Sequence, residues 1–239
     1  MARNTSPRKQ TLTYFFSVEG ETEKWYLDWL EAQINATENA KFKVKLKAEV
    51  QKDPISFAKK LTVQAKTIVW HLSDIEGSTP ADYQAADNTL SRLKETNSLG
   101  KSIVYKYGYS NLSFDLWMIL HKRNHSGSVS AVGNYLTIIN SGYGEQFPSM
   151  KKYKEHDNFH KCLRKLTIAD VCSAIDRAKT ITQRNASSGN PLGFGYEWEV
   201  FLHRCHVRTQ CLKEEAGYRI QQLRSNTGHP TNNTLENPV

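Results

Sequence analysis

The chain alternates between strand-like and helix-like segments from residue 11 to about residue 124, and this alternation limits the fold more than any other feature. β-branched and aromatic residues predict strands over 12–18, 42–48, 67–72 and 102–107. Apolar residues at helical spacing predict helices over 22–34, 53–65, 83–94 and 113–122, the last with Ser113 as its N-cap. Such alternation is typical of a largely parallel sheet flanked by helices. We therefore predict an α/β domain over residues 11–125.

The remaining sequence predicts three further parts. Residues 1–10 form a flexible arm, residues 126–224 form a mostly helical extension packed on the α/β domain, and residues 225–239 form a disordered polar tail. Within the extension, the Gly- and Ser-rich residues 125–150 predict a loop, and residues 158–184 and 195–224 predict helices.

Composition excludes several classes of protein. In 239 residues, 38% hydrophobic and 10% aromatic residues are enough for a buried core. The longest apolar run is Leu116–Leu120, far short of the roughly 20 residues of a membrane helix, and the polar N-terminus is unlike a secretory signal. The four cysteines form no C-x-x-C pair, so we expect no disulfide scaffold and a cytoplasmic location. The net charge of +8 favours a polyanionic partner such as nucleic acid.

Acidic residues follow the predicted strands. Glu19 and Glu23 come after the first strand, Asp74 and Glu76 after the third, and Asp115 starts the helix after the fourth. Ligands of open α/β sheets bind at the carboxyl ends of the strands. Neighbouring carboxylates need a cation or large pKa shifts, and Mg²⁺ prefers oxygen ligands. The pattern predicts a Mg²⁺ (or Mn²⁺) site. The alternative is that these acids cap helices and bind no metal.

Basic residues leave two interpretations open. Lys41, Lys43, Lys45 and Lys47 alternate with apolar residues, so they form either a ridge for a phosphate backbone or the protected face of an edge strand, which we prefer. Lys106, at the end of the predicted fourth strand, is positioned to neutralise a substrate phosphate. The sequence contains no phosphate-binding P-loop, no nucleophile elbow and no dinucleotide fingerprint after the first strand.

Three of these motifs together resemble the RloB-like proteins, which are linked to restriction and phage-defence loci and related to the Toprim domains of OLD-family nucleases. They are Glu19-Gly-Glu-Thr-Glu23, Asp74-x-Glu76 and the run from Ser110 to His121 that contains Phe114, Asp115 and Trp117. The resemblance covers residues 11–125. It implies a Toprim-like fold in which Glu19, Asp74 and Glu76 hold metal while Glu23 and Asp115 assist. Glu76 stands where the family pattern has Asp, and Asp115 where it more often has Glu.

The resemblance implies a Mg²⁺-dependent nuclease that cleaves DNA or RNA, acting as an anti-phage effector. The catalytic residues would be Glu19, Asp74, Glu76, Glu23 and Asp115, to which Lys106 is added from its position alone. A partner ATPase or restriction-system protein and a homo-oligomer are left open, and a membrane partner is not expected. Two other functions stay open: a non-catalytic module that binds nucleic acid or a partner, and a primase-like nucleotidyltransferase.

Overall fold

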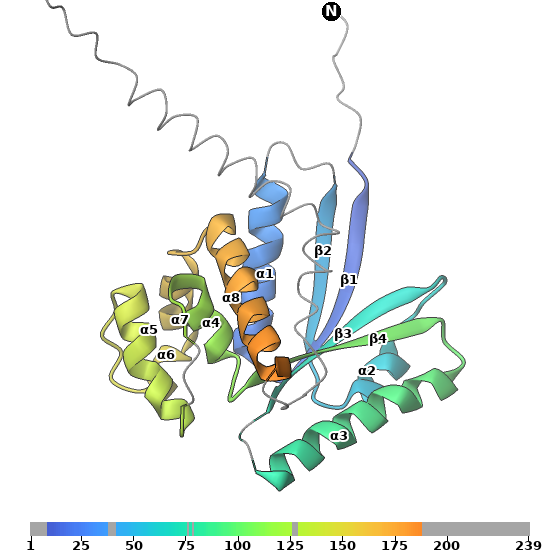
Figure 1. The fold of residues 1–239 in the computed structure, drawn as a ribbon. Helices are drawn as coiled ribbons and strands as arrows, with labels where there is room; N and C mark the ends of the chain where they lie inside the picture. The colour runs from blue at the N-terminus through green and yellow to red at the C-terminus, as the bar shows by residue number, and fades with distance from the viewer. Residues whose placement is uncertain (1–8, 38–41, 76, 78, 126–128, 188–239) are drawn as a thin grey trace, which may run out of the picture.

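A four-stranded parallel sheet forms the centre of the protein (Figure 1). The computed structural model describes residues 9–37, 42–75, 77, 79–125 and 129–187. The strand order is β2-β1-β3-β4, and every pair of neighbours is parallel. The strands are β1 (Thr11–Val18), β2 (Lys43–Val50), β3 (Thr67–Ile75) and β4 (Ile103–Asn111). The predicted α/β class with a parallel sheet is therefore confirmed.

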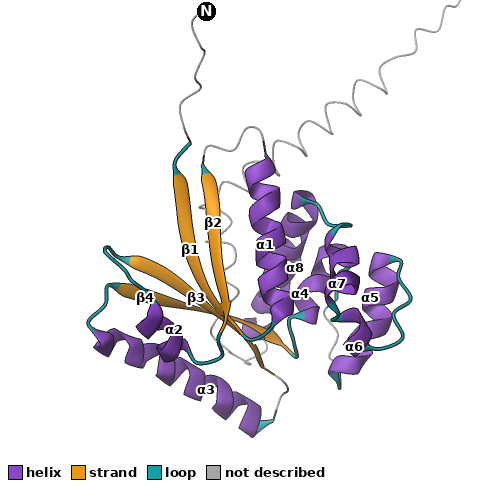
Figure 2. Cartoon of the chain, turned by 180° about the vertical axis from the view of Figure 1, so that it is seen from behind, coloured by secondary structure: helices purple, strands orange, loops and turns teal. Residues whose placement is uncertain are grey.

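Helices lie on both faces of the sheet (Figure 2). One face carries α2 (Pro54–Lys60), α3 (Pro80–Glu95) and the short η1 (Thr96–Leu99). The other face carries α1 (Glu21–Ala36) and α4 (Asp115–Lys122). The chain then continues through η2 (Val132–Asn134), α5 (Tyr135–Tyr143), α6 (Met150–Tyr153), α7 (His156–Leu163) and α8 (Ile168–Ser187).

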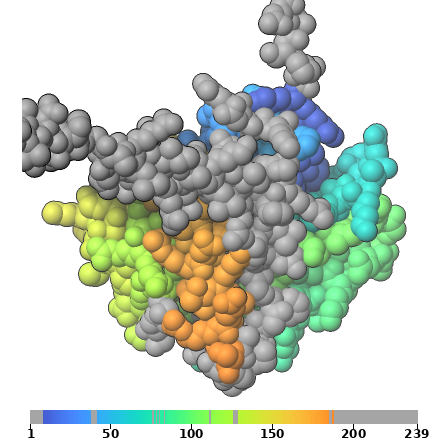
Figure 3. Space-filling view, turned by 45° about the horizontal axis from the view of Figure 1, so that its top comes forward, coloured from blue at the N-terminus to red at the C-terminus, as the bar shows by residue number. Residues whose placement is uncertain are grey.

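Two apolar clusters lie on opposite faces because successive strand residues alternate direction. In β1, Phe16 and Val18 belong to the larger cluster, which continues without a break into α4, α5, α7 and α8. Phe15 of the same strand packs against the smaller cluster around Phe57 of α2 and Val69 of β3. Figure 3 shows α8, in orange, at the surface beside the green and yellow segment that follows β4. One continuous core thus joins the sheet to the described helices that follow it.

The helical extension differs from its prediction in two places. Residues 125–150 do not form only a loop, because Tyr135, Ile139 and Tyr143 are buried at helical spacing and form one face of α5. The predicted helix 158–184 is two helices, α7 and α8. Thr167 and Asp170 exchange hydrogen bonds, since each backbone N–H donates to the other's side chain at 2.8 and 3.2 Å, and this capping box starts α8. The predicted helix 195–224, the arm and the tail lie outside the described residues.

Two helix ends within the α/β domain also differ from the prediction. The helix predicted over 53–65 ends at Lys60, where the Lys101 ammonium donates to the carbonyl of Leu61 at 2.7 Å. Ser113 is not an N-cap, because its hydroxyl donates to the Asp115 carboxylate at 2.7 Å, and Phe114 precedes the first residue of α4.

β2 is an edge strand whose outer side is already bonded to α1. The Asn35 side-chain amide donates to the carbonyl of Val44 and accepts from its N–H, both at 2.8 Å. Leu46 N–H donates to the Glu31 carboxylate at 2.6 Å. Lys43, Lys45 and Lys47 are exposed. The predicted position at a sheet edge is therefore correct, and such strands need protection from pairing with other chains. Both interpretations of these exposed lysines stay open, and Lys41 lies outside the described residues.

None of the described helices combines the length and apolarity that crossing a membrane requires. Among the described cysteines, Cys162 is a buried free thiol, whereas Cys172 is disulfide-bonded. The cysteine spacing did not predict the disulfide at Cys172.

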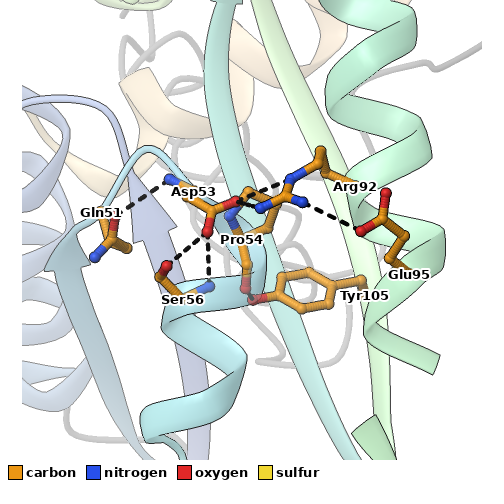
Figure 4. Close-up of polar contacts among 7 residues, drawn as sticks. All are labelled: Gln51, Asp53, Pro54, Ser56, Arg92, Glu95 and Tyr105. Carbon is orange, nitrogen blue, oxygen red and sulfur yellow. Dashed lines mark hydrogen bonds and ion pairs between the residues drawn. The ribbon is translucent and has the colours of Figure 1, made fainter. Parts of the chain in front are cut away.

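Asp53 joins α2 to α3 at the corner shown in Figure 4. Its carboxylate caps α2 by accepting from the Ser56 N–H at 3.0 Å, and it accepts from the Arg92 guanidinium of α3 at 2.9 Å. Tyr105 of β4 donates its hydroxyl to the carbonyl of Pro54 at 2.8 Å. Burial alone would raise the pKa of Asp53, but the hydrogen bonds from Ser56 and Arg92 lower it to about 2.

Asp53→Ala should lower the free energy of unfolding by about 1–2 kcal/mol, because α2 loses its cap and Arg92 loses its partner. Asp53→Ser keeps a capping oxygen and should restore about half of that loss. Urea unfolding of both variants measures the difference, and equal stabilities for the two would contradict a capping role.

Two buried histidines lie within the core. His121 of α4 donates from Nδ1 to the carbonyl of Trp117 at 2.8 Å, while its Nε2 accepts from the Tyr26 hydroxyl of α1 at 3.0 Å. His71 of β3 shares a 2.8 Å hydrogen bond with Ser17 of β1. Burial lowers the pKa of each imidazole to about 4. Both side chains are therefore neutral in the folded protein at pH 7.

His71 and His121 should each lower the free energy of unfolding as the pH drops from about 6.5 towards 4, whereas Asp74, with a pKa raised to about 8, contributes in the opposite direction. In that window the unfolded chain binds protons at its histidines, with an ordinary pKa of about 6.5, while folded His71 and His121 stay neutral. Each contributes a loss of about 2 kcal/mol by pH 5. Urea unfolding at pH 7 and pH 5 tests this, with the exposed His156→Gln as control. Between pH 7 and pH 5, His121→Gln should lose about 2 kcal/mol less stability than the wild type, and an equal change in the two proteins would contradict the assignment.

Candidate functional site

The first two predicted site residues meet at the carboxyl ends of β1 and β3. These strands are neighbours, with Val18 opposite Leu72. Glu19 follows the last residue of β1, and its Oε2 accepts from the backbone N–H of Asp74 at 3.3 Å. Asp74 lies within β3, because that strand extends to Ile75. The parallel pairing therefore brings together two acids that are 55 positions apart in the sequence.

Glu23 joins this group from the first turn of α1. Its side chain is buried, and its Oε2 accepts from the Thr22 hydroxyl at 2.7 Å. Gly20 permits this packing, because a Cβ at that position would lie only 3.1 Å from the same Oε2 atom. Glu23 and Asp74 line one small pocket.

Asp115 is fully buried at the start of α4. Its Oδ2 accepts from the Ser113 hydroxyl at 2.7 Å and pairs with the Lys154 ammonium at 2.9 Å. Its Oδ1 is buried with no hydrogen-bond partner among the described residues. An unpartnered buried carboxylate oxygen is costly, so Asp115 Oδ1 is available to bind a cation or a donor.

Lys154 is the residue that the sequence analysis did not predict for this site. It lies directly after α6, in the helical extension, and reaches Asp115 with a side chain that is 38% exposed. Burial lowers the pKa of the ammonium, but Asp115, Asp74 and Glu23 outweigh burial and raise it. A lysine in a Lys-rich surface segment carries no sequence signal for such a role.

The carboxylates strongly influence one another. Burial raises the pKa of Asp74 to about 8, and the charges of Glu23, Glu19 and Asp115 add to the effect. Burial also raises the pKa of Glu23 against the hydrogen bond from Thr22. A cation at this position would favour the ionised form of both acids. We call Glu19, Glu23, Asp74 and Asp115 the carboxylate cluster.

The pocket beside the cluster is small. Its volume is about 10 Å³, which is room for about one water molecule. It is lined by Glu23, Leu72, Ser73, Asp74, Gly108, Tyr109, Ser110 and Phe114. Gly108 allows β4 to approach β3 here, because a Cβ would lie 2.8 Å from a methyl group of Leu72.

The cluster fits a divalent cation in its chemistry. All four side chains offer hard oxygen donors, which Mg²⁺ and Mn²⁺ prefer, and Asp115 Oδ1 is unused. However, within the described part of the chain no three acidic, His or Cys side chains are arranged as a preformed metal site. Binding therefore requires these side chains to shift. Glu76, predicted as the third ligand, lies outside the described residues.

Lys106 does not lie where its predicted role requires. The fourth strand continues to Asn111, so Lys106 lies in the middle of β4, opposite Trp70. Ser110, opposite Asp74, is four residues further on, or about 13 Å along the strand. The predicted position of Lys106 at the end of the fourth strand is therefore wrong, because the strand is longer than its apolar residues indicate.

Lys154→Met should destabilise the protein by about 1–3 kcal/mol, because the buried Asp115 charge loses its partner. The expected loss is smaller than for a fully buried pair because Lys154 is 38% exposed. In the double variant with Asp115→Asn the loss should be smaller than the sum of the single losses. The matched control is Lys152→Met, which breaks the exposed pair with Glu155 and should cost less than about 0.5 kcal/mol. Equal losses for the two lysine variants would contradict the role of Lys154.

Comparison with known proteins identifies the family. The model of the RloB-like protein family matches residues 14–197, which include Glu19, Asp74 and Lys154. Searches of curated proteins and of solved structures gave no match. Because the family match covers more than half of the 239 residues, this chain belongs to the RloB-like protein family.

Proposed function

We propose that this protein is a divalent-metal-dependent nuclease of the Toprim type that cleaves phosphodiester bonds. The observation that carries the proposal is the meeting of Glu19, Glu23 and Asp74 with Asp115 at the carboxyl ends of parallel strands. This edge is where open α/β sheets bind their ligands. Several buried carboxylates in one place are destabilising without a cation, so their convergence favours a metal-dependent function over a structural one.

The acids have two roles in this proposal. Glu19 and Asp74, with Glu76 as the sequence predicts, would hold Mg²⁺ or Mn²⁺. Glu23 and Asp115 would complete the negative charge around the ion. A bound divalent ion supplies an activated water and stabilises the leaving oxygen of a phosphodiester. The net charge of +8 supports a nucleic-acid substrate, and we propose an antiviral role in the cytoplasm on the resemblance to defence-linked proteins.

Lys154 offers the cation that this chemistry needs at the substrate side. Its ammonium already lies beside the cluster. With a divalent ion held by the carboxylates, Lys154 would be the residue placed to contact a phosphate oxygen of the substrate. The same ion pair also supports a second function, a non-catalytic binding module, because Lys154 neutralises part of the cluster without any metal.

Asp74→Asn should lower the cleavage rate by about 10²–10⁴-fold, because the amide cannot supply the charge that holds the ion. The assay uses the full-length protein with Mg²⁺ or Mn²⁺ on plasmid, single-stranded DNA and tRNA. EDTA should abolish cleavage. Asp87→Asn on the exposed face of α3 is the matched control and should cleave at the wild-type rate.

A second readout separates metal binding from catalysis. Mn²⁺ at about 100 times its dissociation constant should stabilise the wild type by about 2.7 kcal/mol, and Asp74→Asn by much less. Cleavage that persists in EDTA or in Asp74→Asn would overturn the nuclease proposal. Tight metal-independent binding of nucleic acid without turnover would favour the binding module, and incorporation of labelled nucleotides would indicate a nucleotidyltransferase.

A further inference from the structure

A second cavity lies between the edge strand β2 and α2, away from the carboxylate cluster. Its volume is about 340 Å³, within the range of ligand-binding pockets. Phe15, Phe57 and Leu61 supply apolar lining, Lys47 supplies positive charge, and Lys60 lines the cavity together with its ion-pair partner Glu49. The cavity therefore combines aromatic surface with ammonium groups, as sites for single-stranded nucleic acid do.

The sheet surface beside this cavity has no described helix over it. The helices α2 and α3 lie against β3 and β4, whereas the same face of β1 and β2 is open in Figure 2. Thr13 lies opposite Lys45 there, and Phe15 opposite Lys47. Alternation along the strands puts Lys43, Lys45 and Lys47 on this one face.

The ion pairs of the described residues include only some of these lysines. Lys45 pairs with Glu31 at 2.8 Å, and Lys60 pairs with Glu49 at 2.5 Å. Lys43 and Lys47 form no ion pair within the described residues, and the ammonium of Lys47 lies 5.3 Å from the centre of the Phe15 ring. They are about 13 Å apart along β2, so they can contact different phosphates of one strand.

The edge of β2 argues against an extended peptide as the occupant. Peptides add to a sheet by pairing with free backbone groups at its edge. Here Asn35 already bonds both backbone groups of Val44, and Glu31 accepts from the N–H of Leu46. Positive charge and an aromatic ring on the open face remain, which complement phosphates and bases.

We propose that the open face of β1 and β2, with the adjoining cavity, binds one strand of nucleic acid. Lys43 and Lys47 hold phosphates, and a base occupies the cavity against Phe15. We call this surface the β1–β2 face. The proposal deepens the proposed function by naming its substrate class, and only the step from binding to cleavage rests on that function. Phe15 lies in β1, four positions before Glu19 at the carboxyl end of this β-strand. A nucleic-acid strand bound along β1 can therefore continue towards the carboxylate cluster.

The test measures binding of fluorescent oligonucleotides of about 15 nucleotides to the full-length protein in EDTA, so that cleavage cannot interfere. Single-stranded DNA and RNA are compared with a duplex of the same sequence. Lys43→Glu/Lys47→Glu should flatten the dependence of log K on log salt by about 1.4 and weaken binding about 25-fold at about 0.1 M salt. The matched control, Lys161→Glu/Arg164→Glu, reverses two exposed charges at the end of α7 and should bind like the wild type.

Phe15→Leu keeps the apolar volume and removes the aromatic face. It should weaken binding of the single strand about 5- to 150-fold, and circular dichroism checks that it is folded. The proposal is overturned if the duplex binds as tightly as the single strand, if both charge-reversal variants bind alike, or if Phe15→Leu binds like the wild type.

The two proposals can fail separately. If wild-type protein binds single strands through the β1–β2 face but cleaves nothing with Mg²⁺ or Mn²⁺, the face is confirmed and the nuclease proposal fails. If Asp74→Asn loses cleavage while Lys43→Glu/Lys47→Glu keeps full affinity, the nuclease stands and the face is wrong.

Discussion

The hydrogen bond between Tyr26 and His121 fixes the two helices on which the candidate site depends. Both side chains are buried, and the 3.0 Å bond joins α1 to α4 within the larger core. His121 also donates to the carbonyl of Trp117, so both ring nitrogens are satisfied and the neutral imidazole costs little to bury. Glu23 lies near the start of α1 and Asp115 at the start of α4. Tyr26 lies in the second turn of α1 and His121 in the last turn of α4, and docking these helices brings Glu23 and Asp115 close enough for their charges to interact.

The carboxylate cluster shows why the helical extension cannot be separated from the sheet. Three of its acids come from the first 75 residues and Asp115 from α4, but the cation that pairs with Asp115 is Lys154. The extension also completes the core, since Tyr135 and Tyr153 are buried in the same cluster as Phe16. The family match includes this region, whereas the motifs quoted from the sequence end at His121. The extension is therefore part of the site and not an accessory.

The sequence predicted the strands and the first helices well because their apolar residues repeat with clear periods. It predicted boundaries less well. The third and fourth strands continue beyond their apolar cores into Asp74 and Asn111, because backbone pairing with a neighbour does not need apolar side chains. The break before α8 was missed although Thr167 and Asp170 form a capping box, since the apolar pattern continues on both sides of it. Lys106 was predicted at the end of the fourth strand because this strand extends past its apolar residues to Asn111.

The sequence by itself determined the α/β class, the order of strands and helices, and which acids lie at strand ends, because these depend on local periodicity and on residue type. Only the tertiary structure decided that β1 and β3 are neighbours, that Asp74 N–H reaches Glu19, and that Lys154 faces Asp115. It also decided that Lys47 of β2 lies beside Phe15 at a cavity. Strand order and helix docking are set by contacts between distant residues, and a local pattern holds no record of which distant surface will cover it.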